Sequence, residues 1–557
     1  MNNLLKLILG VLMAISLAGC AAIPQDGIVL TGPAVETEAD QENLYYSPSG
    51  PEPGATKEQI LNGFLNAGTG PQNDYAVARE FLSTKIKNKW QPNERVIIQK
   101  LRPTVTVYPN NSASVSTTVL AQIDSAGAYS ELNSGSLEYF QFKFVEENGQ
   151  WRISEAPDLT LVIRPVFEVM FRSYALYFWD ANFENLIPDL RWFPAQATTP
   201  TRMVTALLAG PSEWLADVAK TAFPSGTKLS LNTVTIANSV ATVDFTNRAL
   251  VANTTQKSRF KKQLEQTLTQ LDSVFEVAVL VERTPQEIPD ILTPGAQATG
   301  LYPIVLDADG LRALGGNTSS NLKLASESLR KLAASDFAIS GDLTTVVAAT
   351  PTGVYLTKLG RVAETSKLVD GRKAILTPML DRNEYIWSLG SASGSALLIA
   401  GNNEPVRSIN LGSIAGYDRL SFAISPEGSR LAAVVKTNLG NRLLIAPITR
   451  NAAGMPTSVG QAIDLTPIGA NPFYVSWMSG LDLVLSSVLG EETRPYFVQV
   501  GGVADISTAI YGRAEFQGDA QTGNLHARVD NGDVYRYSSL GWEFVDIEII
   551  AMHFASQ

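Results

Sequence analysis

The C-terminal half of the chain repeats one phrase, in which an apolar run is followed by a tight turn and a second apolar run. The clearest copy is Phe422-Ala423-Ile424, then Ser425-Pro426-Glu427-Gly428, then Leu431-Ala432. A strand, a turn and a second strand form the unit that β-propeller blades repeat every ~40–50 residues. The repeat predicts a degenerate β-propeller of about five or six blades over 295–557, and a β-sandwich is the alternative. Counting weaker copies, the turn glycines have a mean spacing of about 43 residues and are Gly310, Gly341, Gly394, Gly428, Gly480 and Gly523.

The N-terminus carries the pattern of an exported, lipid-modified protein. A short apolar run ends in Leu17-Ala18-Gly19-Cys20, and Cys20 is the only cysteine in the 557 residues. The run is too short for a comfortable membrane span and fits a signal peptide. Its ending has the lipobox pattern of bacterial lipoproteins, which implies cleavage between Gly19 and Cys20 and lipid on the Cys20 sulfur and amine. We predict a lipoprotein signal peptide over 1–19, with an ordinary signal peptide and a chance cysteine as the alternative.

Residues 20–55 have the composition of a flexible tether. After Cys20 this segment contains no Lys or Arg and six acidic residues, with Pro and Gly scattered among them. Such a segment cannot bury enough apolar surface to order itself. Fully extended, it would reach on the order of 115 Å, which would let the folded domains stand away from the membrane.

Composition and charge exclude several classes of protein. Lys and Arg number 43 against 54 Asp and Glu, and the net charge of −11 argues against a general nucleic-acid binder. An acidic chain also gains nothing from an anionic bilayer, so we expect the lipid alone to hold it there. Hydrophobic residues make up 45% of the chain, which excludes a disordered polyelectrolyte. One Cys and two His cannot form an intrachain disulfide or a zinc site of the usual Cys/His kind.

Segment 56–165 predicts a small α+β domain. Thr56 and Gln59 fit a capping box at the start of a helix, and a second helix is expected over 75–87. Helices that precede a curved antiparallel meander suggest an NTF2-like or cystatin-like fold. The period-two strands are expected at 104–108, 114–123, 137–145 and 151–154, with a hairpin turn at Glu147-Asn148-Gly149-Gln150.

Segment 167–290 predicts a second α+β domain. Thr199-Pro200 is expected to start a helix, with Thr199 as N-cap and Pro200 at the first helical position. Another helix is expected over 258–271, where apolar residues recur at helical spacing. Strands are expected at 174–179, 190–193, 229–236, 240–245 and 276–281.

An ordered set of short motifs gives this second segment a family resemblance. In their order along the segment, they resemble the GerMN domain of spore-germination lipoproteins and actinobacterial cell-envelope proteins. The motifs are Tyr177-Phe178-Trp179-Asp180, Leu186-Ile187-Pro188 with Arg191, Leu207-Leu208-Ala209-Gly210-Pro211, Phe223-Pro224-Ser225-Gly226-Thr227 and Val243-Asp244-Phe245.

The order of parts along the whole chain is more specific than any one motif. Lipobox, acidic tether, small α+β domain, GerMN domain and C-terminal β-propeller together resemble the actinobacterial lipoprotein family LpqB. The resemblance implies an accessory protein of the MtrA–MtrB two-component system, which controls cell-wall homeostasis and division. It also implies that the lipoprotein engages the extracellular part of the sensor kinase. No contact residues carry over, because no family motif defines the kinase-facing surface.

Histidines offer little for catalysis or metal binding. His526 and His553 lie in strand-like stretches near the C-terminus, and a metal site would need carboxylates beside them. We expect structural roles for both, with His553 in a final strand that closes the ring. No metal site and no cofactor is therefore predicted, apart from the covalent lipid on Cys20.

Paired carboxylates could hydrolyse glycosides without a histidine. The candidate pairs are Asp307 with Asp309, two residues apart, and Glu491 with Glu492, which are consecutive. Consecutive strand residues such as Glu491 and Glu492 point to opposite faces, and acids in a turn, as expected at Asp309-Gly310, are usually solvated. We therefore predict no catalytic residue.

Two clusters have both a structural and a functional interpretation. The basic run over 257–262 is expected to be the solvated face of a helix, and contact with an acidic wall polymer or an anionic headgroup is the alternative. The aromatic run over 174–179 has too many rings for one buried face. It is expected to divide between core and interdomain packing, with a partner surface as the alternative.

We interpret the chain as a non-enzymatic, mainly β, multi-domain interaction protein that binds no nucleic acid. It is expected to be anchored by lipid at the extracytoplasmic face of the cell membrane, where the extracellular domain of a sensor histidine kinase is its partner. The first alternative is a receptor for a cell-wall fragment or a lipid, and the second is a carboxylate-based wall hydrolase. The sequence does not specify ligand-binding residues.

Overall fold

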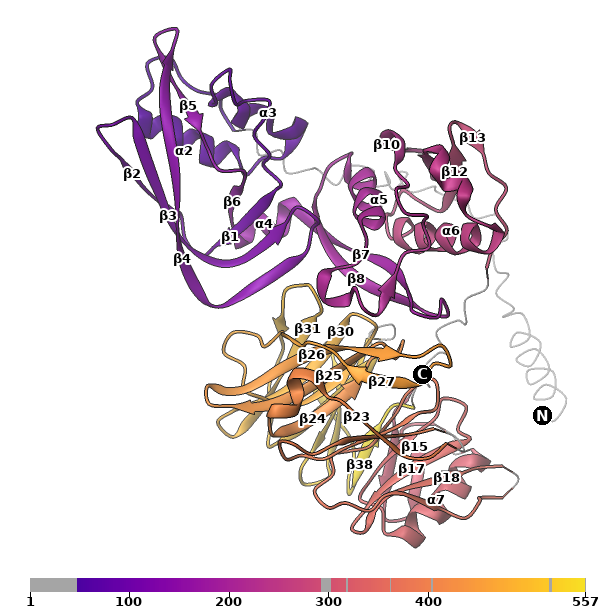
Figure 1. Cartoon of the computed structure of the whole chain (residues 1–557). Coiled ribbons are helices and arrows are strands. Elements are labelled where there is room, and N and C mark those ends of the chain that lie inside the picture. The colour runs from indigo at the N-terminus through magenta and orange to yellow at the C-terminus, as the bar shows by residue number, and fades with distance from the viewer. Residues whose placement is uncertain are drawn as a thin grey trace, which may run out of the picture. The chain divides into compact units, whose positions relative to one another are not determined.

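The computed structural model of the chain describes residues 48–291, 302–316, 319–360, 362–401, 404–519 and 523–555 (Figure 1). The predicted signal peptide, the lipidation site at Gly19 and Cys20, and most of the predicted tether lie outside the described residues. From Pro48 onward the chain forms one compact unit. Three successive groups of elements can be followed within it, and each has its own hydrophobic core.

The first group is a curved sheet covered by helices on both faces. The strand order is β5-β4-β3-β1-β6, with β2 also paired to β3, and only β1 and β6 run parallel. Alternation along β1 separates two cores: Ile97 packs toward helices α2 and α3, whereas Val96 and Ile98 pack toward α4. The elements are α2 (Lys57–Ala67), α3 (Gln72–Glu80), β1 (Arg95–Gln99), β2 (Thr104–Val107), β3 (Ser112–Asp124), β4 (Tyr129–Glu147), β5 (Gln150–Glu155), β6 (Thr160–Ile163) and α4 (Arg164–Met170).

The local predictions for this domain are largely confirmed. Thr56 and Gln59 form the capping box at the start of α2, and Asn148 and Gly149 adopt positive φ in the β4–β5 turn. The second helix is shorter than predicted, because it ends at Glu80 rather than continuing to residue 87. The chain leaves the helix there to pair with β5: the Ser83 amide donates to the Ile153 carbonyl at 2.8 Å, and the Ile153 amide donates to the Phe81 carbonyl at 2.9 Å.

The second group contains two sheets with two helices packed against them. One sheet has the order β8-β7-β9, and the other has the order β10-β11-β12-β13, in which β11 and β12 run parallel. Helices α5 and α6 both contact β7. The elements are β7 (Phe171–Asp180), β8 (Leu186–Pro194), α5 (Thr199–Ala209), η1 (Glu213–Leu215), β9 (Ala219–Lys220), β10 (Leu229–Ala237), β11 (Val240–Phe245), η2 (Asn247–Val251), α6 (Thr254–Leu268), β12 (Glu276–Val281) and β13 (Thr284–Pro285).

Both predicted helices of this group exist, but their starts were misplaced. The N-cap of α5 is Thr198, because the Thr199 hydroxyl instead donates to the Pro194 carbonyl at 2.8 Å. Helix α6 begins four residues earlier than predicted. Asn253 accepts from the Gln256 amide in a capping box, and this polar start has no apolar periodicity to mark it.

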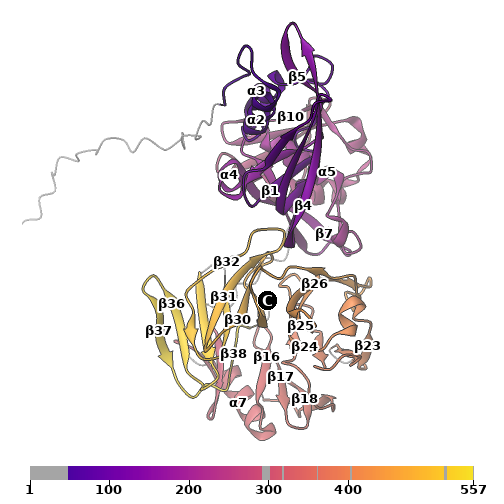
Figure 2. The same ribbon diagram turned by 90° about the vertical axis from the view of Figure 1, so that its left-hand side faces the viewer.

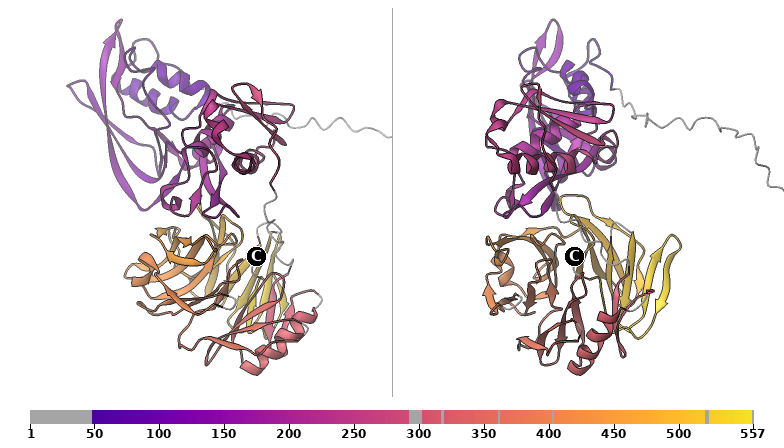
Figure 3. Two further views of the ribbon diagram at one scale, coloured as in Figure 1. Left: turned by 45° about the vertical axis from the view of Figure 1, so that its right-hand side comes forward. Right: turned by 90° about the vertical axis from the view of Figure 1, so that its right-hand side faces the viewer.

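The third group is a ring of sheets (Figures 2 and 3). Among the described residues, six sheets are arranged about a common axis, which agrees with the upper value of the predicted blade number. Helix α7 (Ser320–Leu332) packs against β15 and β17, and η3 is Gly412–Gly416. The strands, sheet by sheet, are β14 (Ile304–Asp307), β15 (Gly310–Ala313) and β38 (Ala551–His553); β16 (Asp336–Ile339), β17 (Thr345–Thr350), β18 (Gly353–Lys358) and β19 (Lys367–Asp370); β20 (Met379–Leu380), β21 (Ile386–Leu389), β22 (Leu397–Ala400) and β23 (Arg407–Ile409); β24 (Arg419–Ile424), β25 (Arg430–Thr437), β26 (Gly440–Arg450), β27 (Pro456–Val459) and β28 (Ile463–Asp464); β29 (Pro472–Trp477), β30 (Asp482–Leu489), β31 (Glu492–Gln499), β32 (Asp505–Ile506) and β33 (Ile510–Tyr511); and β34 (Ala514–Asp519), β35 (Asn524–Val529), β36 (Val534–Ser538) and β37 (Gly541–Asp546).

The ring is closed by strands from its two ends. Strand β38 pairs with β14 in antiparallel register, with Ile304 opposite His553. The expectation that His553 lies in a closing strand is confirmed. Because β38 supplies the inner strand of the sheet that also holds β14 and β15, the first and last parts of the propeller share one blade.

The predicted turn glycines fall into two structural classes. Gly341, Gly428 and Gly480 follow the inner strand of their blades, and Gly523 directly precedes β35. Gly310 is instead the first residue of β15, the third strand of its sheet, and Gly394 lies between the second and third strands β21 and β22. The irregular spacing in the sequence follows from this mixture. In the blade that begins with β20, the turn after the inner strand contains no glycine. Asp381 closes this turn by accepting hydrogen bonds from the Asn383 and Tyr385 amides.

Candidate functional site

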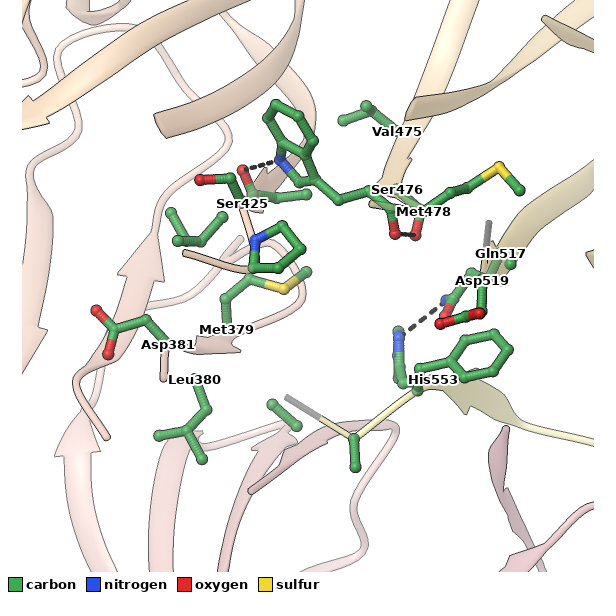
Figure 4. A pocket seen from close by; sticks show the side chains of 18 of the residues that line it. Met379, Leu380, Asp381, Ser425, Val475, Ser476, Met478, Gln517, Asp519 and His553 are labelled. Atoms are coloured by element: carbon green, nitrogen blue, oxygen red, sulfur yellow. Dashed lines mark hydrogen bonds between the residues drawn. The ribbon is translucent and has the colours of Figure 1, made fainter. Parts of the chain in front are cut away.

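A small cavity lies at the carboxyl ends of the six inner strands of the propeller (Figure 4). Its volume is about 130 Å³, which is below the range of about 300–1,000 Å³ typical of drug-sized ligand sites. Strands β16, β20, β24, β29, β34 and β38 all contribute to its wall. The cavity could therefore hold a few waters or a very small ligand. Its labelled lining residues are Met379, Leu380, Asp381, Ser425, Val475, Ser476, Met478, Gln517, Asp519 and His553.

His553 is the most chemically versatile group in this cavity, and its two ring nitrogens already have partners. Nε2 lies 2.6 Å from Oδ1 of Asp336, and Nδ1 lies 2.9 Å from the side-chain nitrogen of Gln517. Because the ionised Asp336 carboxylate can only accept, Nε2 of His553 carries the proton given to Asp336. The same Gln517 nitrogen lies 2.7 Å from the Tyr474 hydroxyl and 2.6 Å from the Met552 carbonyl, and its two N–H groups serve two of these three neighbours at a time.

These contacts form one continuous chain across four inner strands, β16, β38, β34 and β29. Burial raises the pKa of Asp336, but the facing His553 and the hydrogen bonds from His553, Thr377 and the Phe337 amide outweigh it, so that the pKa lies below its usual value. Burial raises the pKa of the Tyr474 hydroxyl well above its usual value. The arrangement holds an ionised carboxylate and a protonated phenol in fixed positions, which suits a structural role. We call the chain of contacts from Asp336 through His553 and Gln517 to Tyr474 the clasp.

His526 does not join His553 in a common site. It lies buried in β35, where its ring approaches Phe554 edge-on at 6.4 Å between centroids. Burial, together with the positive charge of Arg536, lowers its pKa to about 4. Its Nδ1 has no hydrogen-bond partner. Within the described residues no group of three or more His, Cys, Asp or Glu side chains is placed to hold a metal ion.

The two carboxylate pairs also have structural or solvated surroundings. Asp307 accepts from the Asp309 and Gly310 amides and pairs with Arg312 at 2.7 Å. It therefore shapes a turn. Glu491 and Glu492 are exposed at the start of β31.

The basic run in α6 is not the solvated face that the sequence predicts. All four of its cations are half-buried, and their partners come from the same domain. Lys261 pairs with Asp290 at 2.6 Å, and the Arg259 guanidinium lies 4.5 Å from the ring centroid of Phe183. The prediction failed because these partners are distant in sequence from the helix.

The aromatic run belongs mainly to the core of its domain, as predicted. Phe178 is fully buried and Trp179 is 1% exposed. The indole nitrogen of Trp179 donates to the Arg259 carbonyl at 3.1 Å. If only one face of β7 were covered, the alternation of side chains along the strand would expose either Phe178 or Trp179. Both are buried, because α6 and β8 pack against β7.

Strand β8 holds a buried ion pair that sequence reasoning missed. Arg191 and Asp189, 2% and 4% exposed, pair through two contacts of 2.8 and 3.2 Å. Ser212 donates its amide and its hydroxyl to the same carboxylate, both at 2.7 Å. The remaining guanidinium nitrogen donates to the Ala126 carbonyl of the first domain at 2.9 Å. The spacing of Asp189 and Arg191 was a signal in the sequence, because residues two apart on a strand share a face. The sequence could not show that this face is covered by other parts of the chain.

The next residue of β8 contacts both neighbouring domains. The Trp192 amide donates to the Gly127 carbonyl at 2.7 Å, and its indole nitrogen donates to the Gly501 carbonyl of the propeller at 2.9 Å. Gly501 has φ of 83°, and a Cβ there would lie 3.2 Å from the Leu190 carbonyl. We call β8 with these contacts the β8 junction. It joins all three groups of elements through consecutive residues.

A larger cleft lies beside the β8 junction. Its volume is about 800 Å³, within the range of small-molecule sites. Side chains from all three groups line it, including Tyr129, Arg191 and Asp464. Trp214 lines it as well, and Glu213 and Asp217 lie exposed beside it.

Family comparisons match the three groups of elements in order. A model described as "Lipoprotein LpqB, N-terminal domain" matches residues 50–168, "Sporulation and spore germination" (Germane) matches 175–287, and "Lipoprotein LpqB beta-propeller domain" matches 312–546. The two models named for LpqB together cover more than half of the chain. The chain belongs to the LpqB lipoprotein family. The sequence-based resemblance to LpqB and the predicted GerMN and propeller folds are thereby confirmed.

Curated LpqB lipoproteins from actinobacteria agree with this assignment. The chain is 29% identical over 292 residues to Lipoprotein LpqB of Cutibacterium acnes, covering 52% of this chain and 49% of the relative. It is 23% identical over 494 residues to Lipoprotein LpqB of Bifidobacterium longum, covering 85% and 83%. The chain spans about half the length of the first curated relatives that it matches. Among solved structures, the first GerMN domain of GerM from Bacillus subtilis aligns with 22% identity, 22% of this chain, 95% of that chain and a TM-score of 0.19.

Membership in a lipoprotein family indicates attachment to a membrane through lipid. In the part of the chain that the structure describes, no helix is long and apolar enough to cross a bilayer. The predicted attachment residue of this LpqB-family chain, Cys20, lies outside the described residues.

Proposed function

We propose that this LpqB-family protein is a non-enzymatic accessory of a sensor histidine kinase of the MtrA–MtrB type. Lipid on Cys20 would hold it at the extracytoplasmic face of the cell membrane. There it would bind the extracellular domain of the kinase and modulate signalling in cell-envelope homeostasis and division. The β8 junction is the observation that carries the proposal, because it makes three domains into one broad, composite surface.

The groups best suited to chemistry are engaged in contacts that favour this non-catalytic role. His553 and Asp336 are partners in the clasp of the ring, and Asp307 is bound to Arg312. A positional mechanism needs no reactive group. The anchor confines both proteins to one surface and raises their effective concentration, and any change in kinase activity follows from unequal binding to two kinase states.

Binding of the soluble chain, starting after Cys20, to a purified kinase ectodomain tests the proposal. Arg191→Gln should weaken binding by loosening the β8 junction. The matched control is Arg372→Gln, which also breaks an arginine–aspartate pair but lies within the propeller. Saturable binding that is weakened only by Arg191→Gln supports a composite surface. Absence of any complex at high micromolar concentration, for the wild-type chain, refutes the accessory role.

The cleft beside the β8 junction favours a second candidate function, a receptor for a cell-wall fragment or a lipid. Its volume of about 800 Å³ and its mixed aromatic and polar lining suit a ligand. A ligand that binds only the folded chain raises its melting temperature. A thermal-shift screen with soluble wall fragments tests this candidate, and Trp214→Ala should abolish any shift that arises in the cleft.

A further inference from the structure

Three lysines project from one short turn of the first domain. Lys85, Lys87 and Lys89 lie between α3 and β1, and all three are exposed. None of them forms an ion pair or a side-chain hydrogen bond with another described residue. The basic run in α6 differs in this respect, because Lys261 there is paired with Asp290 and Glu265. We call residues 84–89 the lysine turn.

The lysine turn is held rigidly by the domain beneath it. Arg79 donates to the Lys87 carbonyl at 2.6 Å and to the Trp90 carbonyl at 3.0 Å. The Trp90 indole donates to the Pro157 carbonyl at 3.0 Å. Half-buried Ile86 packs against the core of the domain. The backbone is therefore fixed, and the three ammonium groups are presented outward together.

Three carboxylates lie next to the lysine turn, and one of them, Asp158, accepts from the Gln91 amide at 2.8 Å just after it. Glu147 accepts from the Thr84 amide, with both oxygens at 3.2 Å, and from its hydroxyl at 3.1 Å, and Glu80 ends α3. They reduce the local positive charge, but none of them forms an ion pair with Lys85, Lys87 or Lys89 among the described residues. The turn remains a cationic spot on a chain whose net charge is −11.

The lysine turn lies beside the point where the described chain begins. A Cβ on Gly50 would collide with the carboxylate of Glu80. The Gly54 amide donates to Gln150 at 2.9 Å, in the same β4–β5 turn region that holds Glu147. In Figures 1 and 2, α3 and β5 lie together at one end of this domain. The segment that carries the predicted lipid therefore joins the domain at the end that bears the lysine turn.

We propose that the lysine turn binds the anionic headgroups of phospholipids and orients the first domain on the membrane surface. The proposal rests on the lipid anchoring proposed above and not on kinase binding. The anchor keeps the domain near the bilayer, and the lysine turn selects which end of the domain faces it. Lysines at that end act as the second signal that makes a lipid-anchored protein adhere in a defined orientation. The acidic remainder of the chain is then repelled from the same surface.

The expected strength is modest and depends on salt. Each lysine near an anionic surface strengthens binding about fivefold at low ionic strength. Three lysines, partly offset by the three neighbouring carboxylates, should give on the order of tenfold preference for anionic over neutral vesicles. Because the Debye length shortens to about 8 Å at physiological ionic strength, the preference should fall steeply as salt is added.

Vesicle co-sedimentation of the chain from Ala21 to Gln557 tests the proposal. Vesicles of pure phosphatidylcholine are compared with vesicles that contain phosphatidylglycerol. The test variant is Lys85→Glu with Lys87→Glu and Lys89→Glu. The control changes the same number of charges on α7, where Lys323, Arg330 and Lys331 are exposed, each to Glu.

We expect the wild-type chain and the α7 control to prefer phosphatidylglycerol vesicles at 20 mM salt, and the lysine-turn variant to lose at least tenfold of that preference. Equal loss in both variants would mean that total charge alone decides binding, and would overturn the proposal. Binding of the wild-type chain to a soluble anionic wall polymer, without binding to anionic vesicles, would overturn it as well. Both variants should bind the kinase ectodomain in solution like the wild type, so a failure of the kinase proposal leaves the vesicle result interpretable.

Discussion

Acid should destabilise the propeller through His526, and the size of the effect follows from its surroundings. The side chain is 4% exposed, its Nδ1 has no acceptor, and burial together with Arg536 lowers its pKa from 6.5 to about 4. The unfolded chain takes up this proton near pH 6.5 and the folded chain only near pH 4. Between these values the unfolded state binds more protons, so stability falls as the pH falls.

The gap between the two pKa values corresponds to about 3 kcal/mol when the pH has passed below 4. At pH 5 the loss is already about 2 kcal/mol, because the unfolded histidine is then almost fully protonated and the folded one is not. His526→Gln keeps a polar side chain of similar reach but removes the titration. The variant should therefore lose about 2 kcal/mol less than the wild type between pH 7.5 and pH 5.

Two measurements check this reasoning. The chain has two histidines, so labelling the ring carbon of histidine should give two NMR signals, and His526→Gln removes one of them. We expect the lost signal to titrate with a midpoint near pH 4, and urea unfolding of both proteins at pH 7.5 and pH 5 to give the difference in free energy. Arg536→Gln should move the midpoint upward. A midpoint near 6.5 for His526, or the same acid sensitivity in the variant, would refute the argument.

Further predictions concern the clasp, the junction and the anchor. Asp336→Asn replaces the ionised acceptor of His553 Nε2 with a neutral amide and should lower the free energy of unfolding by roughly 3 kcal/mol. Amide hydrogen exchange in β14 and β38 should become faster, and unchanged exchange would contradict a clasp. Because the pKa of Asp336 is lowered in the folded chain, its contribution is present above the unfolded pKa and is lost as the pH falls through the folded pKa, so the difference between wild type and variant should shrink in acid. Trp192→Phe removes the hydrogen bond to Gly501 and should cost about 1 kcal/mol in urea unfolding, whereas Gly501→Ala should cost about 1–2 kcal/mol because its φ is 83°. Cys20→Ser should move the chain from the membrane fraction of cells to the soluble fraction, and retention in the membrane fraction would exclude the lipid as the anchor.

Elements with local signals could be predicted from the sequence. The capping box of Thr56 and the hairpin turn at Asn148 and Gly149 depend on residues within four positions of one another, and both are present. The closing strand at His553 could be expected from its place after the last blade phrase. In contrast, a repeated sequence phrase does not show which strands of a blade its turn connects. Gly394 was therefore grouped with the turns that follow an inner strand, although it lies between β21 and β22.

Long-range partners account for what the sequence did not reveal. The helix after Gln72 ends early because Ile153, far along the chain, offers backbone partners. The cations of α6 are covered by Phe183 and Asp290, which no helical pattern can show. The β8 junction needs Ala126 and Gly501 as well as β8 itself, so its existence depends on how three cores pack.

If the chain is exported as proposed above, the shared blade of β14 and β38 imposes an order of events on that export. A chain that crosses the membrane from its N-terminus delivers β14 and β15 long before β38, so β14 can pair with β15 at once but its other edge only when β38 arrives. Until then that edge of β14 is unpaired, and an exposed strand edge is a site for aggregation. The two preceding domains can fold while the propeller is still an open, incomplete arc. A helper that shields strand edges during export should therefore matter most for this half of the protein, and a truncation before Ala551 should produce a chain whose first two domains are sound and whose propeller never closes.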